Sequence, residues 1–307
     1  MTPVTARQDD GTAGRAEGRA LPPVPGVAHR FVQARGARFH VAQAGTGDPV
    51  VLLHGLPFHW YAWRKLIPEL ARDYQLFCPD LRGCGWSAAT RHGYGTAGQV
   101  LDVLGVMDAL GLGRVRLIGH DSGGWLGFAL CLAAAPERFS GFVALNTPHP
   151  WPGRARLLRD AWRFWYTALW EYPVAGRLVL RHWPGFTRFL LRHWAGPSHR
   201  WDLAALDEFV RASRTPAGSR AVQQALWQFV LREIPALARP GHRPGRLRVP
   251  TLILSGEKDP VARPVPGRRT AGEAGRLEFA TVPGRHLLAE TDPGTVAAAA
   301  RGHFGRC

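Results

Sequence analysis

Short apolar runs alternate with amphipathic stretches along most of the chain. The apolar runs are four to six residues long and lie at 49–53, 75–78, 115–118, 142–145, 251–254 and 277–282. Amphipathic stretches lie between or after them, at about 60–71, 97–110, 124–135 and 293–304. Runs of this length suit buried parallel strands, and helices between such strands form right-handed crossovers. The pattern therefore predicts an α/β fold with a mostly parallel, doubly wound sheet.

One interval breaks this alternation. Residues 148–248 contain no convincing buried strand, and Leu, Trp, Phe and Arg recur there at helical spacing. Eight of the 12 tryptophans lie in this interval. We expect a helical cap inserted between two core segments, 26–147 and 249–307, over the strand ends where open α/β sheets bind ligands. A helical subdomain that only packs is the alternative.

The charge of the chain is strongly positive. There are 39 Lys plus Arg against 23 Asp plus Glu, a formal net charge of +16, and Lys65 and Lys258 are the only lysines. A nucleic-acid binder should concentrate its basic residues on one motif, whereas here they are scattered. A genomic preference for Arg, Ala, Gly and Pro codons explains them better, and we expect no nucleic-acid partner. In the cap, the arginines recur at helical spacing and favour a solvated helix face.

The remaining composition narrows the class of protein. Hydrophobic residues make up 46% of the chain, which is enough for a real core, whereas residues 1–25 lack hydrophobic periodicity and predict a flexible extension. No apolar run is long enough to span a membrane, and no apolar core follows a basic start. These features favour a cytoplasmic protein without a membrane partner; a homodimer stays open. The cysteines lack metal-binding spacing, so we expect reduced thiols, no metal and no cofactor.

The strongest chemical signal is segment 115–124, Val-Arg-Leu-Ile-Gly-His-Asp-Ser-Gly-Gly, which leads into a helical stretch. A strand, a sharp turn and a helix in this order are typical of a nucleophile elbow, whose strained turn needs small residues on both sides of the reactive one. Reading the segment in that register puts Asp121 at the apex. A register with Ser122 as nucleophile would put His120 where a small residue is needed. We therefore favour an aspartate nucleophile; a Gly-rich turn with an exposed Asp is the non-catalytic alternative.

A second signal precedes the elbow. The run Val-Leu-Leu at 51–53 ends in His54, Gly55, Leu56 and Pro57, a loop whose backbone N–H groups can point at the space above the elbow. The N–H of Leu56 and the N–H of Ser122, directly after the nucleophile, would form an oxyanion hole. The His-Gly-x-Pro motif is weak alone, but it becomes specific when an elbow follows.

A base and the acid that orients it should follow the nucleophile. The apolar run 251–254 leads to a turn that carries Asp259, and the run 277–282 leads to a loop that carries His286. His286 lies after the last predicted strand and before the last helix, so it can reach back over the elbow. The strand after the elbow's helix could also supply an acid, but it ends in Asn146. Asp259 and His286 are therefore the predicted acid and base.

Together these motifs resemble the α/β-hydrolase family, specifically the epoxide hydrolase and haloalkane or haloacetate dehalogenase branch with an aspartate nucleophile. The resemblance covers about residues 31–304. Segment 80–87, Asp-Leu-Arg-Gly-Cys-Gly-Trp-Ser, is similar to the family's D-x-R-G-x-G-x-S segment. Segment 146–150, Asn-Thr-Pro-His-Pro, resembles the N-x-P-H-P entry to the epoxide hydrolase cap.

The resemblance implies a covalent mechanism. Asp121 would attack a carbon that accepts it by displacement, and His286 with Asp259 would activate water to hydrolyse the resulting ester. Epoxide opening also needs a proton donor, which family members supply as cap tyrosines. Tyr166 lies where the first of these usually falls, although it could be an ordinary helix tyrosine. Where the second is expected, the nearest match is Trp227, whose indole cannot usefully deliver a proton.

Other functions stay open at this point. A dehalogenase would use the same nucleophile, with Trp165 or Trp227 as halide donors, but haloalkane dehalogenases commonly have Trp, and haloacetate dehalogenases often Arg, where this chain has Ser122. A serine esterase acting through Ser122 and a non-catalytic hydrolase-like binding protein are further alternatives. The sequence favours an epoxide hydrolase, and its many Trp and Phe residues suggest an apolar or aromatic epoxide substrate.

Overall fold

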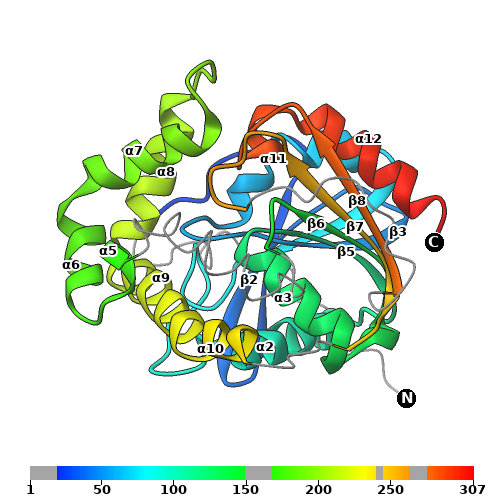
Figure 1. The fold of residues 1–307 in the computed structure, drawn as a ribbon, viewed down its shortest axis with the longest axis horizontal. Coiled ribbons are helices and arrows are strands. Elements are labelled where there is room, and N and C mark those ends of the chain that lie inside the picture. Colours follow the sequence, from blue (N-terminus) through cyan, green and yellow to red (C-terminus); the bar gives the residue numbers. More distant parts are fainter. Residues whose placement is uncertain (1–18, 149–167, 240–244, 263–274) are drawn as a thin grey trace.

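The computed structural model of the chain describes residues 19–148, 168–239, 245–262 and 275–307. Its strands are β1 (Ala28–Ala34), β2 (Ala37–Ala44), β3 (Asp48–Leu53), β4 (Tyr74–Pro79), β5 (Val115–His120), β6 (Phe139–Leu145), β7 (Leu247–Gly256) and β8 (Gly275–Val282). They form one sheet in the order β1-β2-β4-β3-β5-β6-β7-β8 (Figure 1). β1 and β2 pair antiparallel, as do β2 and β4, and the other pairs are parallel. The predicted mostly parallel, doubly wound sheet is confirmed.

The core helices alternate with the strands. They are η1 (Trp60–Trp63), α1 (Ile67–Leu70), α2 (Thr96–Ala109), α3 (Ser122–Ala129), the π-helical turn η2 (Leu130–Ala134), η3 (Pro136–Arg138), α11 (Leu288–Thr291) and α12 (Pro293–Phe304). The predicted helix at 60–71 is interrupted, forming η1 and α1 instead. Pro68 lies at the start of α1 and has no N–H to donate, so a continuous helix would lose a hydrogen bond there.

Both faces of the parallel strands are buried. In β3, Val50 and Leu52 join the apolar cluster under α1, α11 and α12, whereas Val51 and Leu53 join the cluster under α2 and α3. Successive strand residues point to opposite faces, so a strand covered on both sides must be apolar throughout. This is why the six parallel or central strands could be recognised as apolar runs, whereas the edge hairpin β1–β2, which carries His and Arg side chains, was missed.

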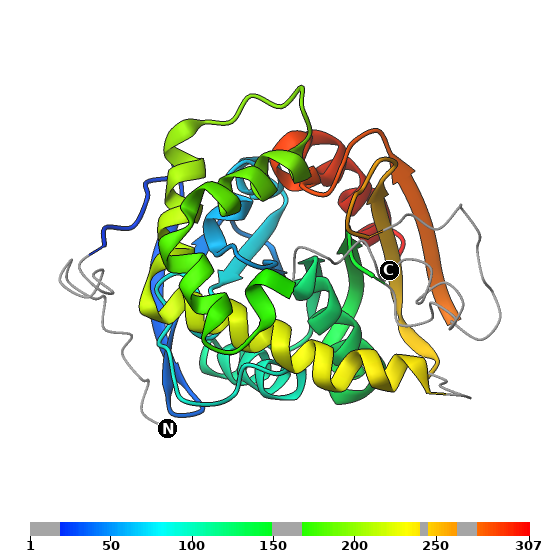
Figure 2. The same cartoon turned by 60° about the vertical axis from the view of Figure 1, so that its left-hand side comes forward.

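The described chain between β6 and β7 is helical. It contains α5 (Ala168–Glu171), α6 (Ala175–His182), α7 (Pro184–Ala195), α8 (Leu203–Arg214), α9 (Pro216–Gln228), the π-helical turn η5 (Phe229–Glu233) and α10 (Ile234–Ala238). Figure 2 brings these helices forward, beside the sheet at the ends of its central strands. No strand occurs in the described residues of this interval. We call the helices α5 to α10 the cap.

Part of the predicted N-terminal extension lies against the core and the cap. The Arg19 guanidinium stacks on the ring of Trp86 at 4.1 Å and donates to the carbonyl of Gly85 at 2.9 Å. Trp86 Nε1 donates back to the carbonyl of Arg19, and Arg19 Nε lies 3.5 Å from a carboxylate oxygen of Glu208 in α8. Residues from 19 onward therefore pack on the molecule, whereas the sequence placed the boundary at residue 25.

Candidate active site

Asp121 occupies the sharp turn between β5 and α3. Its backbone has φ 52° and ψ −119°, a conformation that side-chain-bearing residues rarely adopt. The turn is possible because the residues two positions before and after Asp121 are glycines. A Cβ on Gly119 would lie 2.6 Å from the carbonyl oxygen of Gly123, and a Cβ on Gly123 would lie 2.1 Å from the carbonyl oxygen of Leu53. These contacts are the physical basis of the small-residue pattern that put Asp121 at the apex.

The loop after β3 holds the Asp121 carboxylate. The N–H of Leu56 donates to Oδ2 of Asp121 at 3.3 Å. A Cβ on Gly55 would lie 2.7 Å from the Cβ of Asp121, so this close approach requires a glycine. Ser122 opens α3, where the first N–H groups of a helix have no partner within the helix. The Asp121 side chain is 22% exposed, so a substrate can reach it.

The loop residues beside the proposed oxyanion hole are fixed by buried hydrogen bonds. The His54 imidazole is fully buried; its Nδ1 donates to the carbonyl of Gly55 at 2.9 Å, and its Nε2 accepts the N–H of Leu81 at 3.0 Å. Burial lowers the pKa of His54. The peptide bond between Leu56 and Pro57 is cis. His54 therefore ties the loop after β3 to the loop after β4.

His286 lies between the two carboxylates that the sequence assigned to it. Its Nε2 is 3.8 Å from Oδ1 of Asp121, and its Nδ1 is 3.2 Å from both oxygens of Asp259. The imidazole is almost fully buried, with 2% exposure. The structure thus brings together Asp121, His286 and Asp259, the three residues that the sequence predicts as nucleophile, base and acid.

Asp259 is held by more than the imidazole. Its Oδ1 accepts the backbone N–H groups of Val261 at 2.7 Å and Ala262 at 3.1 Å. Its Oδ2 accepts an amide hydrogen of Asn146 at 2.7 Å, and the same amide nitrogen donates to the carbonyl of Arg285 at 3.0 Å. Asn146, which itself has a positive φ of 46°, therefore clamps Asp259 to the loop that carries His286. From the sequence alone, Asn146 is considered only as evidence that the strand β6 does not end in an acid.

The charges around His286 favour its protonated form. Burial lowers the pKa of the imidazole, but the charge of Asp259, its hydrogen bond and the charge of Asp121 together outweigh burial and raise the pKa. One of these three influences, the Asp121 charge, would vanish if that carboxylate became an ester. The pKa of His286 is thereby linked to the covalent state of Asp121.

His120 is a site residue that sequence reasoning missed. Its Nε2 donates to the carbonyl of His286 at 2.8 Å, and the two rings lie 4.9 Å apart. Burial and the charge of His286 lower the pKa of His120 to about 4, so it is a neutral hydrogen-bond donor near pH 7. Its position directly before Asp121 is the sequence signal that indicates a role in the site. From the sequence alone, His120 is considered only as a side chain too large for the small-residue position of the elbow.

The segment 80–87 is a scaffold at the ends of the strands. The buried Asp80 carboxylate accepts the N–H groups of Trp60 at 2.7 Å and Trp86 at 2.9 Å and pairs with Nδ1 of His40 at 2.8 Å. Burial raises the pKa of Asp80, but the charges of its histidine neighbours and the His40 hydrogen bond lower it to about 2. A Cβ on Gly85 would overlap this carboxylate, which explains the glycine in the motif.

The predicted leaving-group donor lies outside the described residues. This holds for Tyr166 and also for Trp165. Trp227, at the place of the expected second tyrosine, lies on α9 with its ring 5.8 Å from that of Tyr172. The identity of the donor therefore stays a prediction.

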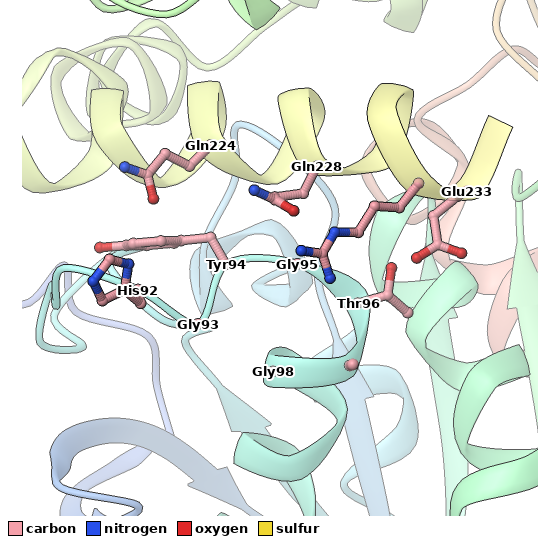
Figure 3. Close-up of a pocket in the computed structure, with 11 residues that line it drawn as sticks. His92, Gly93, Tyr94, Gly95, Thr96, Gly98, Gln224, Gln228 and Glu233 are labelled. Atoms are coloured by element: carbon pink, nitrogen blue, oxygen red, sulfur yellow. The ribbon is translucent and has the colours of Figure 1, made fainter. Parts of the chain in front are cut away.

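The larger of two described cavities does not contain the catalytic residues. A space of about 420 Å³ lies between the loop that opens α2 and the cap helix α9 with η5 (Figure 3). Its lining includes the polar side chains of Gln224, Gln228 and Glu233, which extend from the cap toward the loop that opens α2. A smaller space beside His120 is mainly aromatic and is lined by residues that include Phe58, Trp63, Trp201 and Phe209. The aromatic space has a volume of only about 20 Å³, which is room for about one water molecule, so it is too small to hold a substrate.

The described residues contain no group of three His, Cys, Asp or Glu side chains arranged to hold a metal ion. In the same part of the chain, no helix is both long and apolar enough to cross a bilayer. Cys78, Cys84 and Cys131 are buried and free, and burial raises the pKa of each thiol; Cys307 is free and exposed.

Comparison with known proteins gives several relatives. The soluble epoxide hydrolase of Corynebacterium sp. (strain C12) is 41% identical over 102 residues, 33% of this chain and 36% of that protein. Epoxide hydrolase 4 of Mus musculus is 36% identical over 147 residues, 44% of this chain and 41% of that protein. The match thus spans less than half the length of either relative. The structure of the epoxide hydrolase CorEH superposes with a TM-score of 0.73 at 26% identity, covering 91% of this chain and 99% of that one.

A family model agrees with these relatives over a longer part of the chain. The model is described as the alpha/beta hydrolase fold, and it matches residues 48–293. This range begins at β3 and includes the elbow, the cap, Asp259 and His286. The chain therefore belongs to the alpha/beta hydrolase fold family.

Proposed function

We propose that this protein is an epoxide hydrolase, which adds water to an epoxide ring and releases a vicinal diol. The observation that carries the proposal is the Asp121 carboxylate at the elbow apex, with His286 Nε2 at 3.8 Å and Asp259 behind the imidazole. The names of the relatives support the same activity. A carboxylate in this position is a nucleophile for carbon, because its attack gives an alkyl ester that a base-activated water can cleave.

In the first step, an oxygen of Asp121 attacks one epoxide carbon. A bond forms between them as the ring bond from that carbon to the epoxide oxygen breaks, and the resulting alkoxide takes a proton from a donor. Tyr166 remains our proposed donor, on the basis of its position in the cap sequence. The many Trp and Phe residues of the cap sequence support an apolar or aromatic substrate.

In the second step, His286 removes a proton from water, and the water oxygen attacks the carbonyl carbon of the Asp121 ester. The N–H groups of Leu56 and Ser122 stabilise the oxyanion that forms. Collapse of this intermediate breaks the bond from the ester carbonyl to the diol oxygen, which takes the proton held by His286 as the diol leaves. The second proton of the water passes from the Asp121 carboxyl group to the donor used in the first step, which restores the Asp121 carboxylate and the donor. Ester formation has removed the Asp121 charge, so the pKa of His286 falls and the imidazole is a neutral base when it is needed.

A serine esterase and a dehalogenase, the two competing enzymatic functions, differ from the proposed reaction in the nucleophile and in the leaving group. In the described part of the chain, no hydrogen-bond partner reaches the buried Oγ of Ser122, so no base is in position to activate it as an esterase nucleophile. A dehalogenase would use Asp121 in the same way and differ only in the leaving group. Products therefore decide between an epoxide and a halide substrate.

Heavy-oxygen labelling tests the proposed chemistry. During a single turnover of an apolar aryl epoxide in heavy-oxygen water, we expect label in the Asp121 carboxylate and unlabelled oxygen in the diol. With His286→Gln, the ester should accumulate and raise the intact protein mass by one substrate, whereas Asp121→Ala should show no increase. Label that enters the diol directly, with none in Asp121, would contradict the mechanism. Halide release from haloalkanes or fluoroacetate, without epoxide turnover, would contradict the substrate class.

A further inference from the structure

The large apolar side chains that are exposed in the described residues concentrate on the cap. Leu178 is 52% exposed, Trp183 55% and Phe189 54%. Three of the six others lie on the same short segment, which runs from α5 into α7. The exposed large apolar residues of this segment are Leu169, Tyr172, Val174, Leu178, Trp183 and Phe189. An apolar surface of this kind marks an interaction site on a monomer.

Arginines accompany these side chains. On α6, Leu178 and Arg181 are three residues apart, and on α7 Phe189 and Arg192 are three apart, so each pair lies on one helix face. Arg181 and Arg192 are exposed and make no ion pair among the described residues. We call the exposed side chains of these two helices and of Trp183, which joins them, the rim surface.

Charge is one-sided around the rim surface. Residues 168–195 contain four arginines and one acidic residue; Arg188 is paired with Asp207 of α8, and the other three arginines leave the segment positive, as is the whole chain with its formal charge of +16. Such a surface attracts an anionic partner and repels a second copy of the same chain. Tryptophan beside arginine, with Leu and Phe exposed on the same helices, is the composition of helices that lie at a membrane surface.

We propose that the rim surface docks on the surface of an anionic lipid bilayer. The arginines would contact lipid phosphates, while Leu178, Trp183 and Phe189 would enter the boundary between head groups and acyl chains. In Figure 1, α6 lies at the edge of the molecule opposite α12, so the rim can meet a flat surface while the sheet stays in water. The proposal concerns peripheral contact rather than a spanning helix and revises the expectation that no membrane is a partner. It does not depend on the proposed reaction.

Vesicle sedimentation of the full chain tests the proposal. We expect the chain to sediment with vesicles of phosphatidylglycerol and phosphatidylcholine in equal parts, and far less with phosphatidylcholine alone. The double variant Trp183→Ser with Phe189→Ser keeps the net charge, and we expect it to bind at least about tenfold more weakly. Replacing Arg181 and Arg192 by Gln should weaken binding by about tenfold or more. Leu101→Ser is the matched control, because Leu101 is an apolar residue of the core helix α2 with 45% exposure, and this variant should bind like the parent.

Several outcomes would overturn the proposal. Equal binding by the parent and the Trp183 and Phe189 double variant would mean that net charge alone attracts the vesicles. Absence of sedimentation with the mixed vesicles would exclude the bilayer as the occupant. A concentration-dependent dimer without vesicles that Phe189→Ser dissociates would identify a second copy as the occupant. All substituted side chains are exposed, so we expect every variant to fold. Circular dichroism of each variant checks this.

Discussion

The elbow and the rim surface lie in one chain but follow opposite rules. At the elbow, backbone atoms approach so closely that a single methyl group on Gly123 would lie 2.1 Å from a carbonyl oxygen. At the rim, Leu178, Trp183 and Phe189 expose half or more of their surface. The elbow tolerates one arrangement only, which suits atoms that must react at fixed distances. At the rim surface, docking would require apolar and basic side chains but no exact placement of their atoms, because a bilayer surface has no fixed atomic positions.

The charged groups of the two regions differ in the same way. Asp259 receives hydrogen bonds from two backbone N–H groups and Asn146, so its oxygens are fixed beside His286. Arg181 and Arg192 face solvent on flexible stems. Fixed charges shift the pKa of a neighbour, whereas solvated charges contribute mainly to long-range attraction. Substitutions in the two regions should therefore affect different measurements.

The largest effect should come from the nucleophile. Asp121→Ala removes the atom that forms the ester, so we expect epoxide hydrolysis to fall by about 10⁴-fold or more. Ser122→Ala keeps the backbone N–H and removes only a hydroxyl that has no described partner, so the rate should stay within about threefold of the parent. Steady-state rates on one aryl epoxide check both. The reverse pattern would move the chemistry to Ser122.

Asp259→Asn should produce the next largest effect. The substitution removes the charge and hydrogen bond that raise the pKa of His286, so the pKa should fall and ester hydrolysis should slow by about 10²- to 10³-fold. The neutral imidazole is the base, so the rate of ester hydrolysis rises with pH through the pKa of His286. We expect this rise at lower pH in the variant than in the parent. Single-turnover decay of the ester across pH measures it, and an unshifted profile would mean that Asp259 does not orient His286.

The sequence predicted the parts of the fold that follow from burial on two sides. Each run from 49–53 to 277–282 lies within a strand of the sheet. The central strands are covered on both faces and are therefore apolar throughout, whereas the edge strand β8 exposes Thr281. The hairpin β1–β2 was missed because His29, Arg30, His40 and similar residues interrupt the apolar pattern. His40 is nevertheless buried, since Asp80 pairs with it. Long-range pairing of this kind leaves no local pattern.

Of the candidate site, the sequence predicted the residues that follow from a local motif or from their order along the chain. The elbow is a local motif, and the order of residues along the chain predicted Asp259 as the acid and His286 as the base. Asn146 and His120 were not assigned roles, because each acts on a residue more than a hundred positions away, Asn146 on Asp259 and His120 on the carbonyl of His286. Neutral hydrogen-bond donors such as these are not marked in the sequence by a charge or by a regular spacing from the residues they contact. Only the fold brings them to their acceptors.

Gly123→Ala tests how tightly the elbow is packed. The new Cβ would meet the backbone of β3, which cannot move without shifting the sheet, so we expect the free energy of unfolding to fall by about 3 kcal/mol. Gly113→Ala is the matched control, because nothing lies within 4 Å of its Cβ position. Urea denaturation followed by circular dichroism measures both. Equal stability of the two variants would mean that the elbow can relax.

The smallest effect should come from the rim, and a pair of phenylalanines in α7 isolates it. Phe186 is buried against Trp170, whereas Phe189, one turn further along the same helix, faces out. Phe186→Ser should lower the free energy of unfolding by about 3 kcal/mol, because it leaves a cavity in the cap. Phe189→Ser should change it by no more than about 0.5 kcal/mol, because its ring contributes little burial. If urea denaturation gave equal losses, the rim side chains would be structural, and their exposure would no longer point to a partner. A loss confined to Phe186→Ser would show that fold stability does not require the apolar rim.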